Sequence, residues 1–161
     1  MVSPVERVWN VADSVGVCML TTHSGGGLRA RPVAARVNRD QALIYVVTDV
    51  RSLKTDEIEN SPDVGLTFVD AKQNAYLSMT GRATVVRDVA KTSEVWRKTD
   101  NLWWPGGPED PNVCLLRIDP ALAELWDGPA SAIVHAFEIA KATVTGQEPN
   151  LGENRKATVR M

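Results

Sequence analysis

Residue patterns that carry metal binding or nucleophilic catalysis are missing from this chain. Its 161 residues include two cysteines and two histidines, and no Cys-x-x-Cys or Cys/His spacing suggests a metal ligand set. Cys18 and Cys114 each lie within an apolar, β-rich run, so we expect buried free thiols, and nothing favours a disulfide between them. No arrangement of Ser, His and Asp, of Cys and His, or of paired carboxylates offers independent chemistry. The sequence therefore predicts neither a metal site nor a catalytic residue.

The chain also lacks a strong net charge and any long apolar run. Its 18 basic and 20 acidic residues give a net charge of −2, which provides no field to attract nucleic acid or an anionic membrane. No stretch approaches the length of a membrane span, and residues 1–17 lack a basic segment followed by a continuous apolar run. We therefore expect a cytoplasmic protein that binds neither nucleic acid nor a membrane.

The glycine motifs of the common nucleotide-binding folds are absent as well. No Gly-x-Gly-x-x-Gly follows an expected strand, which excludes a Rossmann-type site. The triple glycine at 25–27 is not followed by Gly-Lys-Ser/Thr or by a helix start. A flexible hairpin loop explains these glycines better than a phosphate loop.

Alternating apolar and polar residues dominate what remains and indicate a mainly β protein with flanking helices. About six strands fit a small antiparallel barrel better than a doubly wound sheet. Gly81 interrupts one strand, which suggests a bulge or a close backbone approach. The expected strands are 15–22, 29–37, 42–48, 64–69, 75–87, 113–118 and 121–126, with a kink or a break at Pro120 between the last two. The expected helices are 4–12 with Ser3 as the cap, 53–59, 90–101 and 131–142.

The stretch from residue 29 to residue 69 holds cationic and hydroxyl side chains that a core would not need. Arg29 and Arg31 share one face of a strand with aliphatic residues, and Ser52 is a plausible N-cap for the helix that follows. Lys54 falls in the first turn of that helix, where the helix dipole disfavours a cation by up to about 1 kcal/mol. An anion bound there would explain this placement, and Thr48 could add a hydroxyl to a phosphate site. The alternative is a solvated first turn with an ordinary cap.

Two adjacent tryptophans stand in a loop rich in proline and glycine. Trp103 and Trp104 precede Pro-Gly-Gly-Pro-Glu-Asp-Pro, which disfavours regular structure. Each indole carries a large apolar area that is costly to leave in water. These side chains therefore cover the mouth of the barrel, a subunit interface or a flat ring system, and the sequence alone leaves these alternatives open.

Several motifs, in this order, resemble the flavin-binding split barrels of the pyridoxamine 5'-phosphate oxidase superfamily, in particular its general stress protein branch. The resemblance covers about residues 1 to 140. The motifs are R-x-R-P-V at 29–33, V-T-D-x-R-S-x-K at 47–54, Y-L-S-M-T-G-R-A at 76–83, W-W-P-G-G-P-E-D-P at 103–111 and A-E-L-W-D-G at 123–128. The resemblance implies a six-stranded antiparallel split β-barrel over residues 1–143. Residues 144–161 are mostly polar and contain glycine, so we expect a mobile tail there. The resemblance also implies a homodimer that holds FMN between its subunits, with FAD or F420 as alternative cofactors.

The family's roles can be carried over to matching positions of this chain. The resemblance implies that Arg31 and Lys54 contact the phosphate and that backbone near Pro32 and Val46 lies along the ring. Leu53 stands where the oxidase usually has an arginine, so that Arg29 or Arg51 would have to compensate. The cofactor-binding residues implied are Arg31, Pro32, Val33, Val46, Val47, Thr48, Ser52, Leu53, Lys54 and Trp104.

The carboxyl-terminal segment separates this chain from the oxidase itself. Residues 153–158 do not reproduce the arginine- and histidine-bearing segment that binds the pyridoxal substrate, so we do not expect oxidation of vitamin B6. The first hypothesis is an FMN-dependent oxidoreductase that passes electrons from a reduced nicotinamide to an unidentified acceptor. The second is a stress protein that stores or senses the flavin without turnover.

Overall fold

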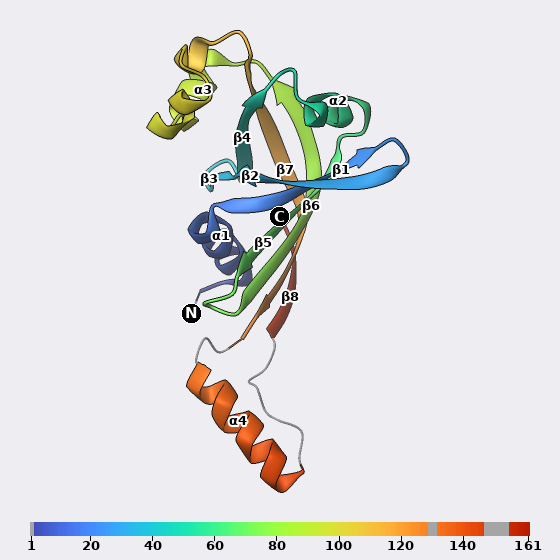
Figure 1. Cartoon of the computed structure of the whole chain (residues 1–161), viewed down its shortest axis with the longest axis vertical. Helices are drawn as coiled ribbons and strands as arrows, with labels where there is room; N and C mark the ends of the chain where they lie inside the picture. The colour runs from blue at the N-terminus through green and yellow to red at the C-terminus, as the bar shows by residue number, and fades with distance from the viewer. Residues whose placement is uncertain (1, 129–131, 147–154) are drawn as a thin grey trace.

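An antiparallel sheet of eight strands organises the computed structural model, which describes residues 2–128, 132–146 and 155–161. The strands follow the order β2-β1-β5-β6-β7-β4-β3, with β8 added to β7 (Figure 1). No pairing joins β2 to β3 among the described residues, so the barrel stays open, as expected of a split barrel. The strands are β1 (Val17–Ser24), β2 (Gly27–Ala34), β3 (Arg36–Asn38), β4 (Leu43–Asp49), β5 (Asp63–Asp70), β6 (Ala75–Val86), β7 (Val113–Asp127) and β8 (Arg155–Arg160).

The helices lie around this sheet and at its two ends. In Figure 1, α2 and α3 lie at one end of the molecule, α1 packs beside the sheet, and α4 lies beyond β8 at the other end. No helix in the described part of the chain is both long and apolar enough to cross a lipid bilayer. The helices are α1 (Pro4–Val15), α2 (Leu53–Asn60), α3 (Val89–Val95) and α4 (Ala132–Thr145), and two 3-10 turns are η1 (Lys98–Leu102) and η2 (Gly107–Glu109).

The first helix begins as the sequence predicts and closes one side of the core. Ser3 Oγ accepts a hydrogen bond from the Glu6 amide at 3.1 Å, and the Ser3 amide donates to Glu6 Oε2 at 2.9 Å. This reciprocal pair satisfies two amides that the helix leaves free. The helix buries Val8, Trp9 and Ala12 against the side chains that the strands direct inward. The predicted cap at Ser3 is confirmed.

Alternation along the strands places the core as predicted, but three boundaries differ. The strand expected at 29–37 is divided at Ala35, whose amide donates to the Gly16 carbonyl at 2.7 Å instead of continuing β2. The helix expected at 90–101 ends at Val95, because Trp96 adopts an extended conformation with ψ of 139°. Of the kink or break expected at Pro120, the break is not found, since β7 runs from Val113 to Asp127, but its pairing with β6 is irregular at this point.

The expected polar tail from residue 144 is also partly structured. α4 continues across the boundary expected at residue 143, and β8 pairs with the second half of β7 from Leu122 to Asp127. In β8, Ala157 and Val159 are half-buried while the residues beside them are exposed. The alternation of Ala157 and Val159 with polar residues is a strand pattern, but it is short and lies in a segment of polar composition, so the sequence analysis did not predict a strand here. Residues 147–154 of the expected tail lie outside the described residues.

A bulge between β6 and β7 explains why Pro120 does not end the strand. The register shifts between Thr80 and Gly81, so that Gly81 faces Pro120 while Thr80 faces Leu122. A bulge interrupts the ladder of hydrogen bonds and therefore tolerates a residue without an amide hydrogen. A Cβ built on Gly81 would collide with the Asp119 carbonyl oxygen and lie 2.8 Å from Pro120 Cα. The close backbone approach predicted at Gly81 is confirmed.

Replacing Gly81 by alanine is therefore expected to destabilise the fold. The added methyl group meets backbone that cannot move without separating β6 from β7, and we expect a loss of about 1–3 kcal/mol in the free energy of unfolding. The control is Gly65→Ala on β5, where the nearest atoms to a Cβ lie 3.8 and 3.9 Å away. Urea denaturation of both variants measures the difference. Equal losses in the two variants would contradict the role assigned to Gly81.

Candidate functional site

A cavity of about 510 Å³ opens between the end of β2, the end of β4, the first turn of α2 and the segment that carries Trp103 and Trp104, which we call the tryptophan segment. We call it the β4 cavity. Its volume falls in the range of roughly 300–1,000 Å³ that is usual for small-molecule sites. Seven of the ten residues that the sequence analysis proposed for cofactor binding line it. They are Pro32, Val33, Val46, Val47, Thr48, Lys54 and Trp104.

Three of the proposed residues do not line this cavity. Leu53 is 59% exposed and lines a smaller hollow of about 300 Å³. Ser52 occupies the predicted N-cap position of α2, but its side chain makes no capping hydrogen bond, and its Oγ lies 3.0 Å from Thr55 Oγ1. Arg31 is bound to Glu57 and Thr22. The Thr55 amide in the first turn of α2 donates to the Ser52 carbonyl at 3.1 Å, so at most the amides of Leu53 and Lys54 remain for an anion at this helix start.

Lys54 provides a partly buried positive charge at the cavity wall. No carboxylate of the described residues forms an ion pair with it. Burial lowers the pKa of Lys54, and the positive charge of Arg31 lowers it further. An anion in the cavity would offset both effects because it would stabilise the ammonium form. The position of Lys54 in the first turn of α2 agrees with the sequence prediction.

Arg31 belongs to a network that joins β1, β2 and α2. Its Nη2 donates to Glu57 Oε2 at 2.6 Å, and its Nη1 donates to Thr22 Oγ1 at 2.6 Å. Thr22 in turn donates to Glu57 Oε2. The hydrogen bond from Thr22, and then those from Arg31, lower the pKa of Glu57. Arg31 lies close enough to Lys54 to influence its pKa, but its guanidinium already has a carboxylate partner.

The tryptophan segment forms the opposite wall. The Trp104 ring lies 6.2 Å from the Trp96 ring, tilted by 56°. Asp49 at the end of β4 binds Arg51 through both carboxylate oxygens, at 2.9 and 2.7 Å, and these bonds hold the pKa of Asp49 well below its usual range. The Arg51 guanidinium therefore already has a carboxylate partner, Asp49, at the edge of the β4 cavity. Trp103 also lines the cavity but is 77% exposed.

Sequence reasoning missed a buried ion pair that fixes this wall. Arg36 Nη2 donates to Asp100 Oδ1 at 2.6 Å, and both side chains are more than nine-tenths buried. The Asp100 carbonyl accepts the amides of Trp103 and Trp104, each at 3.0 Å. Arg36 Nε is buried without a hydrogen-bond partner, and Arg36 lines the cavity. No local signal predicts this pair, because its members are 64 residues apart.

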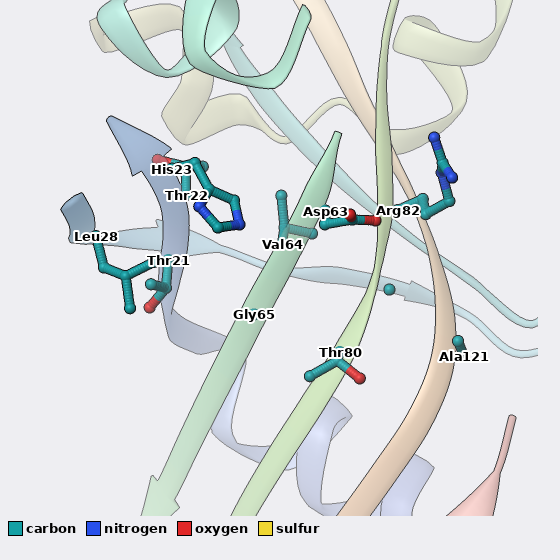
Figure 2. A pocket seen from close by; sticks show the side chains of 11 residues that line it. Thr21, Thr22, His23, Leu28, Asp63, Val64, Gly65, Thr80, Arg82 and Ala121 are labelled. Atoms are coloured by element: carbon teal, nitrogen blue, oxygen red, sulfur yellow. The ribbon is translucent and has the colours of Figure 1, made fainter. Parts of the chain in front are cut away.

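A second hollow of about 530 Å³ lies on the outer face of the sheet, over β1, β5 and β6 (Figure 2). Thr22, His23, Val64 and Thr80 project around it, and Arg82 lies at its edge. We call it the outer hollow. It offers no metal site, because no group of three or more His, Cys, Asp or Glu side chains in the described ranges could hold an ion. Leu28 at its border is an apolar side chain that is 73% exposed.

Comparisons with known proteins show which family and which solved folds this chain is similar to. A family model described as "Pyridoxamine 5'-phosphate oxidase like" matches residues 3–150. General stress protein 26 of Bacillus subtilis (strain 168) is 27% identical over 118 residues, which cover 71% of this chain and 82% of that protein. The crystal structure of a candidate general stress protein 26 from Jannaschia sp. CCS1 is 26% identical, with a TM-score of 0.80 and 100% of each chain covered. A general stress FMN/FAD binding protein from Xanthomonas citri is 24% identical, with a TM-score of 0.68 over 75% of this chain and 86% of that chain, and this likeness shows the fold alone.

Proposed function

The chain belongs to the pyridoxamine 5'-phosphate oxidase-like family, and we propose that it is a general stress-type flavoprotein that binds FMN in the β4 cavity. The observation that carries this proposal is the combination, within one cavity, of an aromatic wall at Trp104 and a partly buried ammonium group at Lys54. A flat ring system that bears a phosphate matches both. The general stress relatives, one of which is described as FMN/FAD binding, support the same reading.

The donors at the cavity fit this cofactor. The Lys54 ammonium group and the amides of Leu53 and Lys54 would hold a phosphate, since a helix N-terminus and an ammonium group both favour anions. Val33 and Val46 supply apolar surface for a ring.

The reaction in this proposal is electron transfer from a reduced nicotinamide to an acceptor. A bound flavin supplies this chemistry, so the chain needs no nucleophile or paired carboxylates of its own. The residues of the cavity bind and orient the flavin and shield it from water. Oxidation of vitamin B6 is not part of the proposal, because residues 153–158 lack the oxidase's substrate-binding pattern and residues 155–158 lie in β8.

The proposal includes a homodimer in the cytoplasm. The outer hollow with the exposed Leu28 at its border (Figure 2), together with the exposed Met19 on β1, would form a surface that a second copy of this sheet could cover. Arg82 would then face the partner subunit. Burial of this apolar surface is the driving force for the association.

Purified protein tests these proposals together. We expect a yellow dimer, with a mass by light scattering of about twice the 17.6 kDa chain, that releases FMN on denaturation. Addition of NADH or NADPH without oxygen should bleach the flavin absorbance, and an electron acceptor should restore it. Mass spectrometry of the released cofactor distinguishes FMN from FAD and F420. A flavin that stays oxidised in a tight complex would instead indicate a storage or sensor protein, and a colourless protein that takes up no flavin would contradict the site.

A further inference from the structure

The guanidinium group of Arg31 is held on the side of Glu57 rather than directed into the β4 cavity. Arg31 donates to Glu57, to Thr22 and, at 3.3 Å, to the Leu20 carbonyl. Its side chain is 19% exposed and that of Glu57 is 10% exposed, so water screens this contact only weakly. A phosphate that reaches Arg31 therefore meets a donor that already has an anionic partner.

Glu57 also acts on the charge of the cavity itself. It lies three residues after Lys54 on α2, and its negative charge favours the ammonium form of Lys54 while Arg31 disfavours it. Arg29 also forms an ion pair with Glu57, at 3.7 Å, so Arg29, Arg31 and Lys54 bring three positive charges to this region and Glu57 offsets one of them. A phosphate monoester carries between about −1.5 and −2 charges at pH 7. Glu57 therefore removes one unit of the positive charge that would otherwise attract this phosphate.

We infer that Glu57 is a specificity-determining residue, which weakens the binding of a phosphorylated flavin relative to the same flavin without its phosphate. This inference rests on the proposed flavin site. Glu57 acts through Arg31 and is therefore a positioning residue. Carboxylate and phosphate both accept hydrogen bonds from the same fork of guanidinium donors, so the two anions compete for Arg31.

Thr22 strengthens this competition. It is buried, and it donates to Glu57 while it accepts from Arg31. Movement of Glu57 away from Arg31 would therefore also disturb the hydrogen bond from Thr22. A glutamine at position 57 keeps an oxygen that Thr22 can bind but removes the negative charge. The Glu57→Gln variant thus separates the charge of Glu57 from its contribution to packing.

The test compares two flavins that differ in the phosphate. Dissociation constants of FMN and riboflavin are measured by fluorescence quenching, after removal of any copurified flavin, for the parent protein and for Glu57→Gln. We expect Glu57→Gln to bind FMN about tenfold more tightly, as removal of one nearby like charge predicts, with riboflavin binding unchanged. A structural role alone would change both dissociation constants together.

Glu59→Gln is the matched control. Glu59 lies on the same helix, is exposed, and forms no ion pair in the described structure, so this variant has the same net charge as Glu57→Gln and should bind both flavins as the parent does. A Glu57→Ala variant is measured in parallel in case Glu57→Gln does not fold, and the same rise in FMN preference is expected. An unchanged ratio of FMN to riboflavin affinity, or an equal rise in Glu59→Gln, overturns the inference while the flavin site stands. A parent protein that binds neither flavin overturns the proposed function and this inference with it.

Discussion

Replacing Lys54 by glutamate is expected to weaken FMN binding by about 3 kcal/mol, roughly a hundredfold in Kd, because it reverses a partly desolvated charge at the phosphate end of the cavity. Lys54 is the cavity-lining cation that forms no ion pair with any carboxylate of the described residues. The new carboxylate would repel the phosphate and would also compete with it for Arg31. Isothermal titration of parent and variant with FMN measures the change.

The matched control for this change is Lys72→Glu, which alters the net charge equally. Lys72 is exposed in the turn between β5 and β6, at the opposite end of β5 from α2. Its replacement should leave FMN affinity unchanged at physiological salt, since charges separated by more than a Debye length are largely screened. If Lys54→Glu retains FMN as well as the Lys72 control does, the phosphate does not bind at Lys54.

Breaking the buried pair of Arg36 and Asp100 is expected to have the largest effect on stability. Arg36→Met leaves an uncompensated carboxylate that is 6% exposed, and Asp100→Leu leaves an equally isolated guanidinium, so each should cost about 3–5 kcal/mol. The double variant removes both charges and should be much less destabilised than the two single variants together. Urea denaturation of all three variants gives this double-mutant cycle.

The exposed pair of Arg39 and Asp13 serves as the reference. Their closest oxygen and nitrogen are 3.3 Å apart, and their side chains are 45% and 59% exposed. Loss of Arg39 should therefore lower the free energy of unfolding by less than about 1 kcal/mol. A double variant of the buried pair that is as unstable as the sum of its singles would show that Arg36 and Asp100 are not coupled.

Local patterns predicted much of this fold because they depend on neighbouring residues. The alternation of β5 and β6, the cap at Ser3 and the close approach at Gly81 each follow from steric or hydrogen-bonding rules that act within a few residues. The same is true of Lys54 in the first turn of α2. These features also identified one end of the β4 cavity.

The remaining features depend on residues that are distant in sequence. Arg31 was expected to be a phosphate ligand, and nothing near it reveals that Glu57, 26 residues later, binds its guanidinium. Likewise, the helix expected to run to residue 101 concealed the turn that places Asp100 beside Arg36. Tertiary contacts of this kind override local propensity, so the electrostatic details of the site required the structure.

The strand β8 has a practical consequence for work with this protein. It covers the backbone of β7 between Leu122 and Asp127, and its Lys156 binds Glu124 at 3.1 Å. Shortening the chain before residue 155 would leave a bare row of amide and carbonyl groups, which in other proteins templates intermolecular pairing and insoluble aggregates. Purification tags and fusion partners are therefore better placed at the amino end, where Ser3 and the start of α1 are exposed.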